Sequence, residues 1–178
     1  MGRRKRLRKS AMTAGIILLA GMILSGLTVP ECTEASADTA DKVFVIKNKR
    51  VMFLLREGEI LKSYRISLGR QPLGHKVRAG DKRTPEGTYL LDYRNPNSRF
   101  HKGFHISYPN EADTARALRL GVPPGGDIML HGLSSLREPL GKGHRREDWT
   151  DGCIAVTNAE IEEIWKLVPD GTPIEITP

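Results

Sequence analysis

Cysteine is almost absent from this 178-residue chain: it has two, and only Cys153 lies beyond residue 37. A disulfide framework is therefore excluded for residues 38–178, which must be held together by a hydrophobic core, as a chain of this length can be. The chain has five histidines, and no C-x-x-C pair accompanies them. The sequence thus predicts no metal site and no cofactor. Without repeats or low-complexity tracts, it also predicts a single domain over residues 38–178.

The chain also has little net positive charge once residues 1–37 are left out. The chain has 28 Lys and Arg against 21 Asp and Glu, a net charge of +7. Residues 1–37 hold six of the basic and two of the acidic side chains, so 22 basic and 19 acidic residues remain, a net charge of +3. This mild excess gives no reason to expect a nucleic acid partner.

Long apolar runs are missing except for one near the N-terminus. Six basic side chains within residues 3–9 precede the uncharged run Ala11–Val29, which is the pattern of an export segment. Ala35-Ser36-Ala37 matches an A-x-A cleavage site and favours a signal peptide over residues 1–37. The apolar run is also nearly long enough to remain as a membrane anchor. We therefore expect an exported protein of the periplasm or cell wall, touching a membrane only through residues 11–29 if they are retained.

Short β-rich runs separated by turn residues dominate the rest of the chain. The predicted strands are residues 43–46, 51–55, 60–68, 88–93, 104–107 and 174–176. The first three are joined by polar turns at hairpin spacing, which predicts an antiparallel meander, and a turn is predicted at residues 95–98. Two short helices are predicted, one over residues 111–120 and one after a capping box formed by Thr157 and Glu160. Pattern alone indicates an all-β or α+β fold.

A histidine and a thiol each lie at the end of a predicted strand. His131-Gly132 ends one apolar run, and Gly152-Cys153 begins another. An imidazole can take the proton of a thiol and produce the thiolate that attacks a carbonyl carbon. Gly152 allows a substrate backbone to approach closely, and N–H groups at such a turn can hold an oxyanion. The alternative for Cys153 is burial as a small hydrophobic residue, which the following Ile-Ala-Val would suit.

The stretch around these residues resembles the YkuD-type L,D-transpeptidases, enzymes of bacterial peptidoglycan. The matching residues are His131, Gly132, Thr150, Gly152, Cys153 and Asn158. At position 151 the family has a second histidine and this chain has Asp151, so the stretch resembles a divergent branch of the family. A separate segment, residues 80–89, resembles the family's G-D-x-x-T-P-E-G-x-Y. Together the two segments span residues 80–158, more than half of residues 38–178.

The resemblance implies a mainly β fold, a sandwich of mixed sheets with two short helices. It also implies that Cys153 is the nucleophile and His131 the base, with Gly132, Asp151 and Gly152 supporting the substrate or the oxyanion. The expected donor is a peptidoglycan stem peptide, which forms a thioester with the thiol. An amine acceptor then gives a 3-3 cross-link or an attached wall protein. Water instead gives hydrolysis, and an inactive wall-binding domain is the remaining alternative.

Three further expectations concern the segment between the histidine and the cysteine. Residues 133–150 are expected to form a mobile cover over the cleft. His144, within this cover, is the rival of His131 as base, although neighbouring positive charge would lower the pKa of its imidazole. Asp151 is expected to point away from the sulfur, to pair with Arg145 or Arg146 or to bind the substrate amine, and to take no part in acid–base chemistry.

Overall fold

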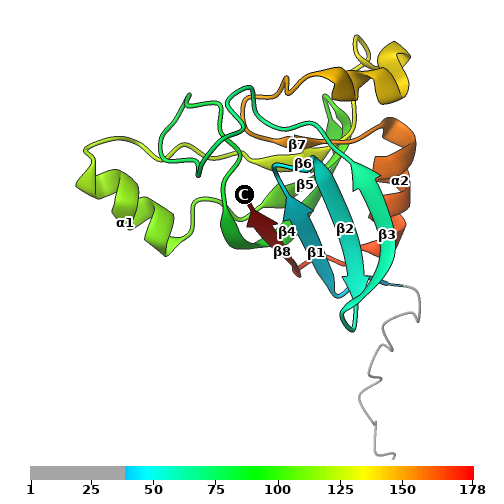
Figure 1. Ribbon diagram of the computed structural model, residues 1–178, viewed down its shortest axis with the longest axis horizontal. Coiled ribbons are helices and arrows are strands. Elements are labelled where there is room, and N and C mark those ends of the chain that lie inside the picture. Colours follow the sequence, from blue (N-terminus) through cyan, green and yellow to red (C-terminus); the bar gives the residue numbers. More distant parts are fainter. Residues whose placement is uncertain (1–38) are drawn as a thin grey trace, which may run out of the picture. The chain divides into compact units, whose positions relative to one another are not determined.

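The computed structural model describes residues 39–178, which form a mainly β unit (Figure 1). The expected export segment, residues 1–37, lies outside the described residues. Among those that are described, no helix has the length and apolar character needed to cross a membrane. The strands are β1 (Lys42–Ile46), β2 (Val51–Arg56), β3 (Glu59–Arg65), β4 (Gly87–Ser98), β5 (His101–Ile106), β6 (Met129–His131), β7 (Ile154–Ala155) and β8 (Thr172–Thr177).

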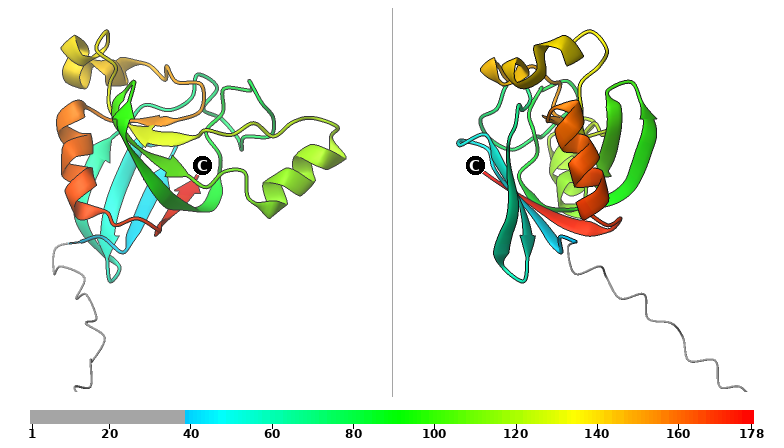
Figure 2. Two further views of the ribbon diagram at one scale, coloured as in Figure 1. Left: turned by 180° about the vertical axis from the view of Figure 1, so that it is seen from behind. Right: turned by 90° about the vertical axis from the view of Figure 1, so that its right-hand side faces the viewer.

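All eight strands belong to one mixed sheet with the order β3-β2-β1-β8-β4-β5-β6-β7. Two pairs are parallel, β1 with β8 and β6 with β7, and the other neighbours are antiparallel. The sheet curls, and α2 lies between its two halves (Figure 2). The predicted mainly β fold of mixed strands is confirmed, with the two halves joined through β8 into one continuous sheet.

The predicted meander is present as β1, β2 and β3. Alternate residues of β1 and β2 point inward, so that Val43 and Val45 meet Met52 and Leu54, all with no exposed surface. This period-two burial is the expected signature of a sheet that is covered on one face. The C-terminal strand β8 then pairs with both β1 and β4, and this pairing joins the meander to the rest of the sheet.

The turn predicted at residues 95–98 is wrong, because β4 continues through it to Ser98. Asn95 pairs with Gly103 and Ser98 with His101, with an irregular register between the two pairs. An irregularity of this kind lets Pro96, which has no N–H to donate, lie within a strand. The long β4–β5 ribbon that results reaches the edge of the sheet where β6 and β7 are found.

Both predicted α-helices form where they were expected. α1 (Glu111–Arg119) begins with a capping box between Asn110 and Asp113, and α2 (Asn158–Leu167) begins with the predicted one between Thr157 and Glu160. α2 buries Ile161 and Ile164 and sets Trp165 against Phe104 of β5, with ring centroids 5.1 Å apart. α1 projects to one side of the sheet, and the connection of residues 120–128 leads from it back to β6 (Figure 1).

Residues 133–150 include a 3-10 segment, η1 (Glu138–Arg146), which is interrupted at Gly141, where φ is 46°. Leu133 and Trp149, near the two ends of this stretch, form a small apolar cluster with Ala155, and Phe100 packs against it. This aromatic cluster is separate from the main core and lies beside β6 and β7. It forms the surroundings of His131.

Candidate active site

His131 and Cys153 lie at the edge of the sheet on two neighbouring parallel segments. His131 of β6 pairs with Ala155 of β7. Side chains two residues apart in an extended segment point to the same face, so Cys153 lies diagonally across from His131 on one face. The backbone N–H of Met129, two residues before His131, lies 3.4 Å from Cys153 Sγ. The fold thus places the expected nucleophile and base on neighbouring segments at one edge of the sheet.

His131 is held in an aromatic enclosure. Its side chain is 1% exposed, its ring stacks on Phe100 with centroids 4.4 Å apart, and the Trp149 ring stands edge-on at 5.9 Å. Nδ1 lies 2.7 Å from the carbonyl oxygen of Gly132. Because a carbonyl can only accept, Nδ1 carries the proton, and Nε2 of the neutral ring is left as the acceptor.

The enclosure also keeps the imidazole neutral. Burial lowers the pKa of His131 to about 4, and the fields of Arg99 and His144 act in the same direction. The hydrogen bond to Gly132 favours the charged form but does not compensate. At neutral pH His131 is therefore an unprotonated base with a fixed tautomer, as removal of a thiol proton requires.

Cys153 is half-buried and is the free cysteine of the described residues. Its sulfur accepts the Met129 N–H, and the thiol faces the carbonyl oxygen of Asp127 at 3.7 Å. Burial raises the pKa of the Cys153 thiol, and the negative charge of Asp151 raises it further; the Met129 hydrogen bond and nearby cations oppose these effects without cancelling them. The resting group is thus a thiol, which needs a base before it can attack.

The turn before Cys153 requires glycine. Gly152 has φ of 135°, and a Cβ there would lie 2.8 Å from the carbonyl oxygen of Arg83 and 3.0 Å from Ile128. Its N–H donates to Thr150 Oγ1, and the Thr150 hydroxyl donates to the carbonyl of Cys153. Thr150 therefore braces the turn. The N–H of Gly152, expected to hold an oxyanion, is engaged within the protein.

The second segment resembling the family, residues 80–89, packs directly on this turn. Besides the contact between Arg83 and Gly152, the carbonyl of Lys82 crowds Gly69, and the N–H of Gly69 donates to Thr84 Oγ1. A Cβ on Gly69 would lie 2.1 Å from that carbonyl and 3.1 Å from Gly152 Cα. Segments far apart in the sequence thus form one backbone surface around the thiol.

Gly132 has a packing role and orients the base. A Cβ at this position would lie 2.6 Å from Asn158 Oδ1, and the same oxygen accepts the N–H of Leu133 at 2.7 Å. The N–H of Gly132 donates to the carbonyl of Lys102, and its carbonyl holds His131. These contacts explain why residue 132 is a glycine and residue 158 an asparagine. They leave no N–H of Gly132 for a substrate.

Asp151 points to solvent and forms an ion pair with Arg70, whose Nη1 lies 2.8 Å from Oδ1. The expected pairing with Arg145 is wrong, because Arg145 binds Glu160 of α2. Arg70 comes from the segment after Gly69, and its N–H donates to the carbonyl of Thr150. Asp151 and Arg70 therefore fasten the turn to that segment.

His144 is buried within the segment that was expected to form a mobile cover. It is 1% exposed, and its Nδ1 accepts from the indole N–H of Trp149 at 3.4 Å and lies 3.1 Å from the hydroxyl of Ser67. Burial lowers the pKa of His144 to about 4, and the charge of Arg145 lowers it further. His144 thus supports Trp149, the indole that lies against His131.

Lys47 is a contributor to the site that sequence reasoning missed. Its ammonium, 2% exposed, donates to the carbonyls of Gly74 and Thr84 and to Glu86 Oε1. Burial lowers the pKa of Lys47, while the bond to Glu86 opposes this effect. The signal was present, because Lys47 continues the inward positions 43 and 45 of β1. The Lys47 ammonium ties residues 80–89 to the sheet.

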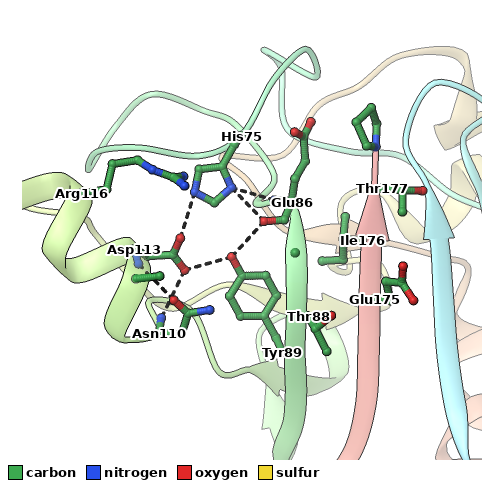
Figure 3. Close-up of a pocket in the computed structure, with 13 residues that line it drawn as sticks. His75, Glu86, Thr88, Tyr89, Asn110, Asp113, Arg116, Glu175, Ile176 and Thr177 are labelled. Atoms are coloured by element: carbon green, nitrogen blue, oxygen red, sulfur yellow. Dashed lines mark hydrogen bonds and ion pairs between the residues drawn. The ribbon is translucent and has the colours of Figure 1, made fainter.

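A separate cavity of about 480 Å³ lies between α1 and the ends of β4 and β8 (Figure 3). His75 Nε2 lies 2.9 Å from Asp113 Oδ1, and the other carboxylate oxygen accepts the Tyr89 hydroxyl at 2.9 Å. The backbone N–H of Glu86 donates to His75 Nδ1. Among residues 39–178, no cysteine, serine or threonine is bonded to His75, and its partners tie α1 to the start of β4.

No group of three or more His, Cys, Asp or Glu side chains within residues 39–178 is arranged to hold a metal ion. The chemistry available at β6 and β7 is that of a thiol and a neutral imidazole. The fold is a curled mixed sheet that carries these two groups on neighbouring segments at its edge.

The family of this domain follows from its sequence. The model of the YkuD family, the L,D-transpeptidase catalytic domain, matches residues 40–176, and the chain belongs to this family. The predicted relationship is therefore confirmed. YafK of Escherichia coli (strain K12) is 28% identical over 177 residues, which cover 91% of this chain and 64% of YafK. The chain thus spans less than two thirds of the length of this curated relative.

Solved structures show the same fold. A mutant of the helical cell shape determining protein Pgp2 from Campylobacter jejuni superposes with a TM-score of 0.57 at 25% identity, over 79% of this chain and 47% of Pgp2. Bd1075 from Bdellovibrio bacteriovorus gives 0.54 at 24% identity, over 81% of this chain and 50% of Bd1075. An L,D-transpeptidase from Xylanimonas cellulosilytica gives 0.50 at 15% identity, over 80% and 63%.

Proposed function

We propose that this protein transfers the acyl group of a peptidoglycan stem peptide to an acceptor through a thioester on Cys153. The observation that carries the proposal is the position of a thiol and a neutral imidazole on neighbouring segments of one sheet edge, where the N–H of Met129, two residues before His131, reaches Cys153 Sγ. Membership of the L,D-transpeptidase catalytic domain family supplies the substrate class. Such a substrate places the activity outside the cytoplasm, in the periplasm or cell wall.

In the first half-reaction, His131 Nε2 takes the Cys153 proton and the sulfur attacks a carbonyl carbon of the donor. The carbon–sulfur bond forms as the amide carbon–nitrogen bond breaks, and the imidazolium returns its proton to the departing amine. Since Gly152 and Gly132 use their N–H groups within the protein, we assign the oxyanion to the N–H of Cys153 itself, at the end of the turn.

In the second half-reaction, the acceptor attacks the thioester, His131 takes a proton from it, and the sulfur leaves as the thiol. An amine acceptor, from a second stem or a wall-linked protein, gives a new amide bond. Water gives hydrolysis and a shortened stem. The likeness to Pgp2, a helical cell shape determining protein, supports a role in remodelling the wall.

The test is incubation of the protein with purified muropeptides, followed by mass spectrometry of the protein and the products. We expect a covalent adduct on Cys153 and products joined to an added amine. Products that carry only water would assign the protein to the hydrolases of the same substrate. Absence of both adduct and products across a panel of muropeptides would leave a wall-binding domain and overturn the proposed reaction.

A further inference from the structure

The tip of the β4–β5 ribbon packs against His131. Arg99 and Phe100 form this tip, between Ser98 at the end of β4 and His101 at the start of β5. The N–H of Phe100 donates to the Ser98 hydroxyl at 3.1 Å, and His101 has a positive φ of 74°, a backbone conformation typical of tight turns. This turn sets the Phe100 ring on the imidazole of His131, with centroids 4.4 Å apart.

Glu162 of α2 fastens the tip. Its Oε1 lies 2.7 Å from His101 Nε2, and its Oε2 forms an ion pair with Lys102 Nζ at 2.8 Å. The N–H of Lys102 donates to the carbonyl of Phe100 at 3.0 Å. The backbone that carries Arg99 is therefore held in a defined place beside the base.

The guanidinium of Arg99 packs on the ring that covers His131. Its central carbon lies 4.9 Å from the centroid of Phe100. An aromatic face attracts a guanidinium, and such packing leaves the N–H donors at its rim free. The Arg99 side chain is exposed, and within the part of the chain that the structure describes it forms no hydrogen bond or ion pair. Its positive charge is thus fixed in place without being neutralised.

This unpaired charge also acts at the thiol. The charged side chains that act most strongly on Cys153 are Asp151, Arg99 and Lys76. Asp151 is paired with Arg70 at 2.8 Å, and Lys76 is paired with Asp81 at 2.9 Å. Among residues 39–178, Arg99 has no such counter-charge. The surroundings of the sulfur therefore carry a net positive charge, which belongs to Arg99.

We propose that Arg99 is a positioning residue, whose fixed and unpaired charge stabilises the negative sulfur that forms when Cys153 loses its proton. The inference deepens the proposed function and rests on it, because Cys153 is the attacking residue there. The proton passes from Sγ to His131 Nε2, and the guanidinium neither gives nor takes one. The same charge disfavours the imidazolium, which helps His131 to pass that proton on to the departing amine.

The test measures the thiolate itself. The full-length protein is treated with iodoacetamide, an uncharged reagent, over a range of pH. Alkylation is followed by mass spectrometry on the peptide that contains Cys153, since the chain also contains Cys32. Arg99→Gln should move the pH profile upward and slow alkylation at neutral pH by about two- to fivefold, as the loss of one exposed charge would give. Arg99→Lys restores the charge and should recover most of the rate.

Arg119→Gln is the matched control. Arg119 is also exposed and without an ion pair in the described residues, but it lies on α1 and is not among the charges that act most strongly on Cys153. Its pH profile should be that of the parent. High salt should reduce the difference between the parent and Arg99→Gln, because the guanidinium is exposed. If Arg99→Gln keeps the profile of the parent, or if Arg99→Lys is impaired as much as Arg99→Gln, the assignment is wrong.

Failure of this proposal can be told apart from failure of the proposed function, because iodoacetamide requires no peptidoglycan. A charge-dependent shift at Arg99, without any thioester from muropeptides, would keep the role of Arg99 at the thiol and remove the acyl transfer. A thioester that forms equally fast on the parent and on Arg99→Gln would keep the reaction and remove Arg99 from it.

Discussion

Two histidines, His131 and His75, are held in very different ways in this domain. His131 has aromatic rings on its faces and a backbone carbonyl at Nδ1. His75 has Asp113 at one ring nitrogen and the backbone of residue 86 at the other. The first ring is left neutral with one nitrogen free to accept, and the second is engaged at both nitrogens. A histidine buried among apolar groups can act as a base, whereas a histidine buried against a carboxylate holds two parts of the fold together.

The largest effect expected is at the thiol beside the first histidine. Cys153→Ala should abolish turnover, because no other thiol in the described residues can form the thioester. A small side chain replaces a half-buried one, so the free energy of unfolding should stay within about 1 kcal/mol of the parent. Turnover of muropeptides and urea denaturation measure the two effects. Retained turnover would remove Cys153 as the nucleophile.

The next largest effect should distinguish His131 from His144 by the rate of acylation of Cys153. His131→Ala should slow acylation by about two to four orders of magnitude, the usual contribution of a positioned base. His144→Ala should cost less, since His144 acts on His131 only through Trp149. Single-turnover labelling of Cys153 by a donor peptide compares them. If His144→Ala has the greater effect, the base has been assigned to the wrong imidazole.

The neutral state of His131 predicts a stability cost in acid. Its pKa is about 4 in the folded protein and near 6.5 when exposed, so between these values the unfolded chain binds more protons. Stability should therefore fall as the pH decreases from 6.5 towards 4, by roughly 3 kcal/mol in total from this residue. Urea titrations at several pH values should show a shallower decline for His131→Gln. An unchanged decline would mean that other groups cause it.

A substitution at the contacts of His75 should lower the free energy of unfolding without affecting turnover. Asp113→Asn weakens the contact between the carboxylate and His75 Nε2 and the hydrogen bond from the backbone N–H of Asn110 at the start of α1. We expect a loss of about 1 to 3 kcal/mol of unfolding free energy, because Asp113 is buried. Turnover by the folded fraction should be unchanged. A large loss of turnover without a loss of stability would place the cavity of Figure 3 in the reaction and end the contrast between the histidines.

Sequence reasoning succeeded where the information was local. The meander, the Thr157–Glu160 capping box and the strand ends that carry His131 and Cys153 follow from spacing within a few residues. It could not place β8 between β1 and β4, since pairing across most of the chain is not encoded in local periodicity. For the same reason, Arg70, which lies 81 residues from Asp151 in the sequence, was not among the partners expected for it, which were Arg145, Arg146 or a substrate amine.

The smallest effect concerns Asp151, where the chain departs from its family. The carboxylate is exposed and bound to Arg70, yet its charge contributes to the raised pKa of the Cys153 thiol, after burial. Asp151→Asn should therefore lower the thiol pKa slightly, and Arg70→Gln should raise it, because the carboxylate then loses its counter-charge. The pH dependence of alkylation by iodoacetamide measures both shifts, which high salt should reduce, since the pair is exposed. Shifts of the same sign would show that the pair acts through the shape of the turn. A large downward shift in Asp151→Asn would show that the carboxylate faces the sulfur directly, and the outward orientation would then describe only the resting protein.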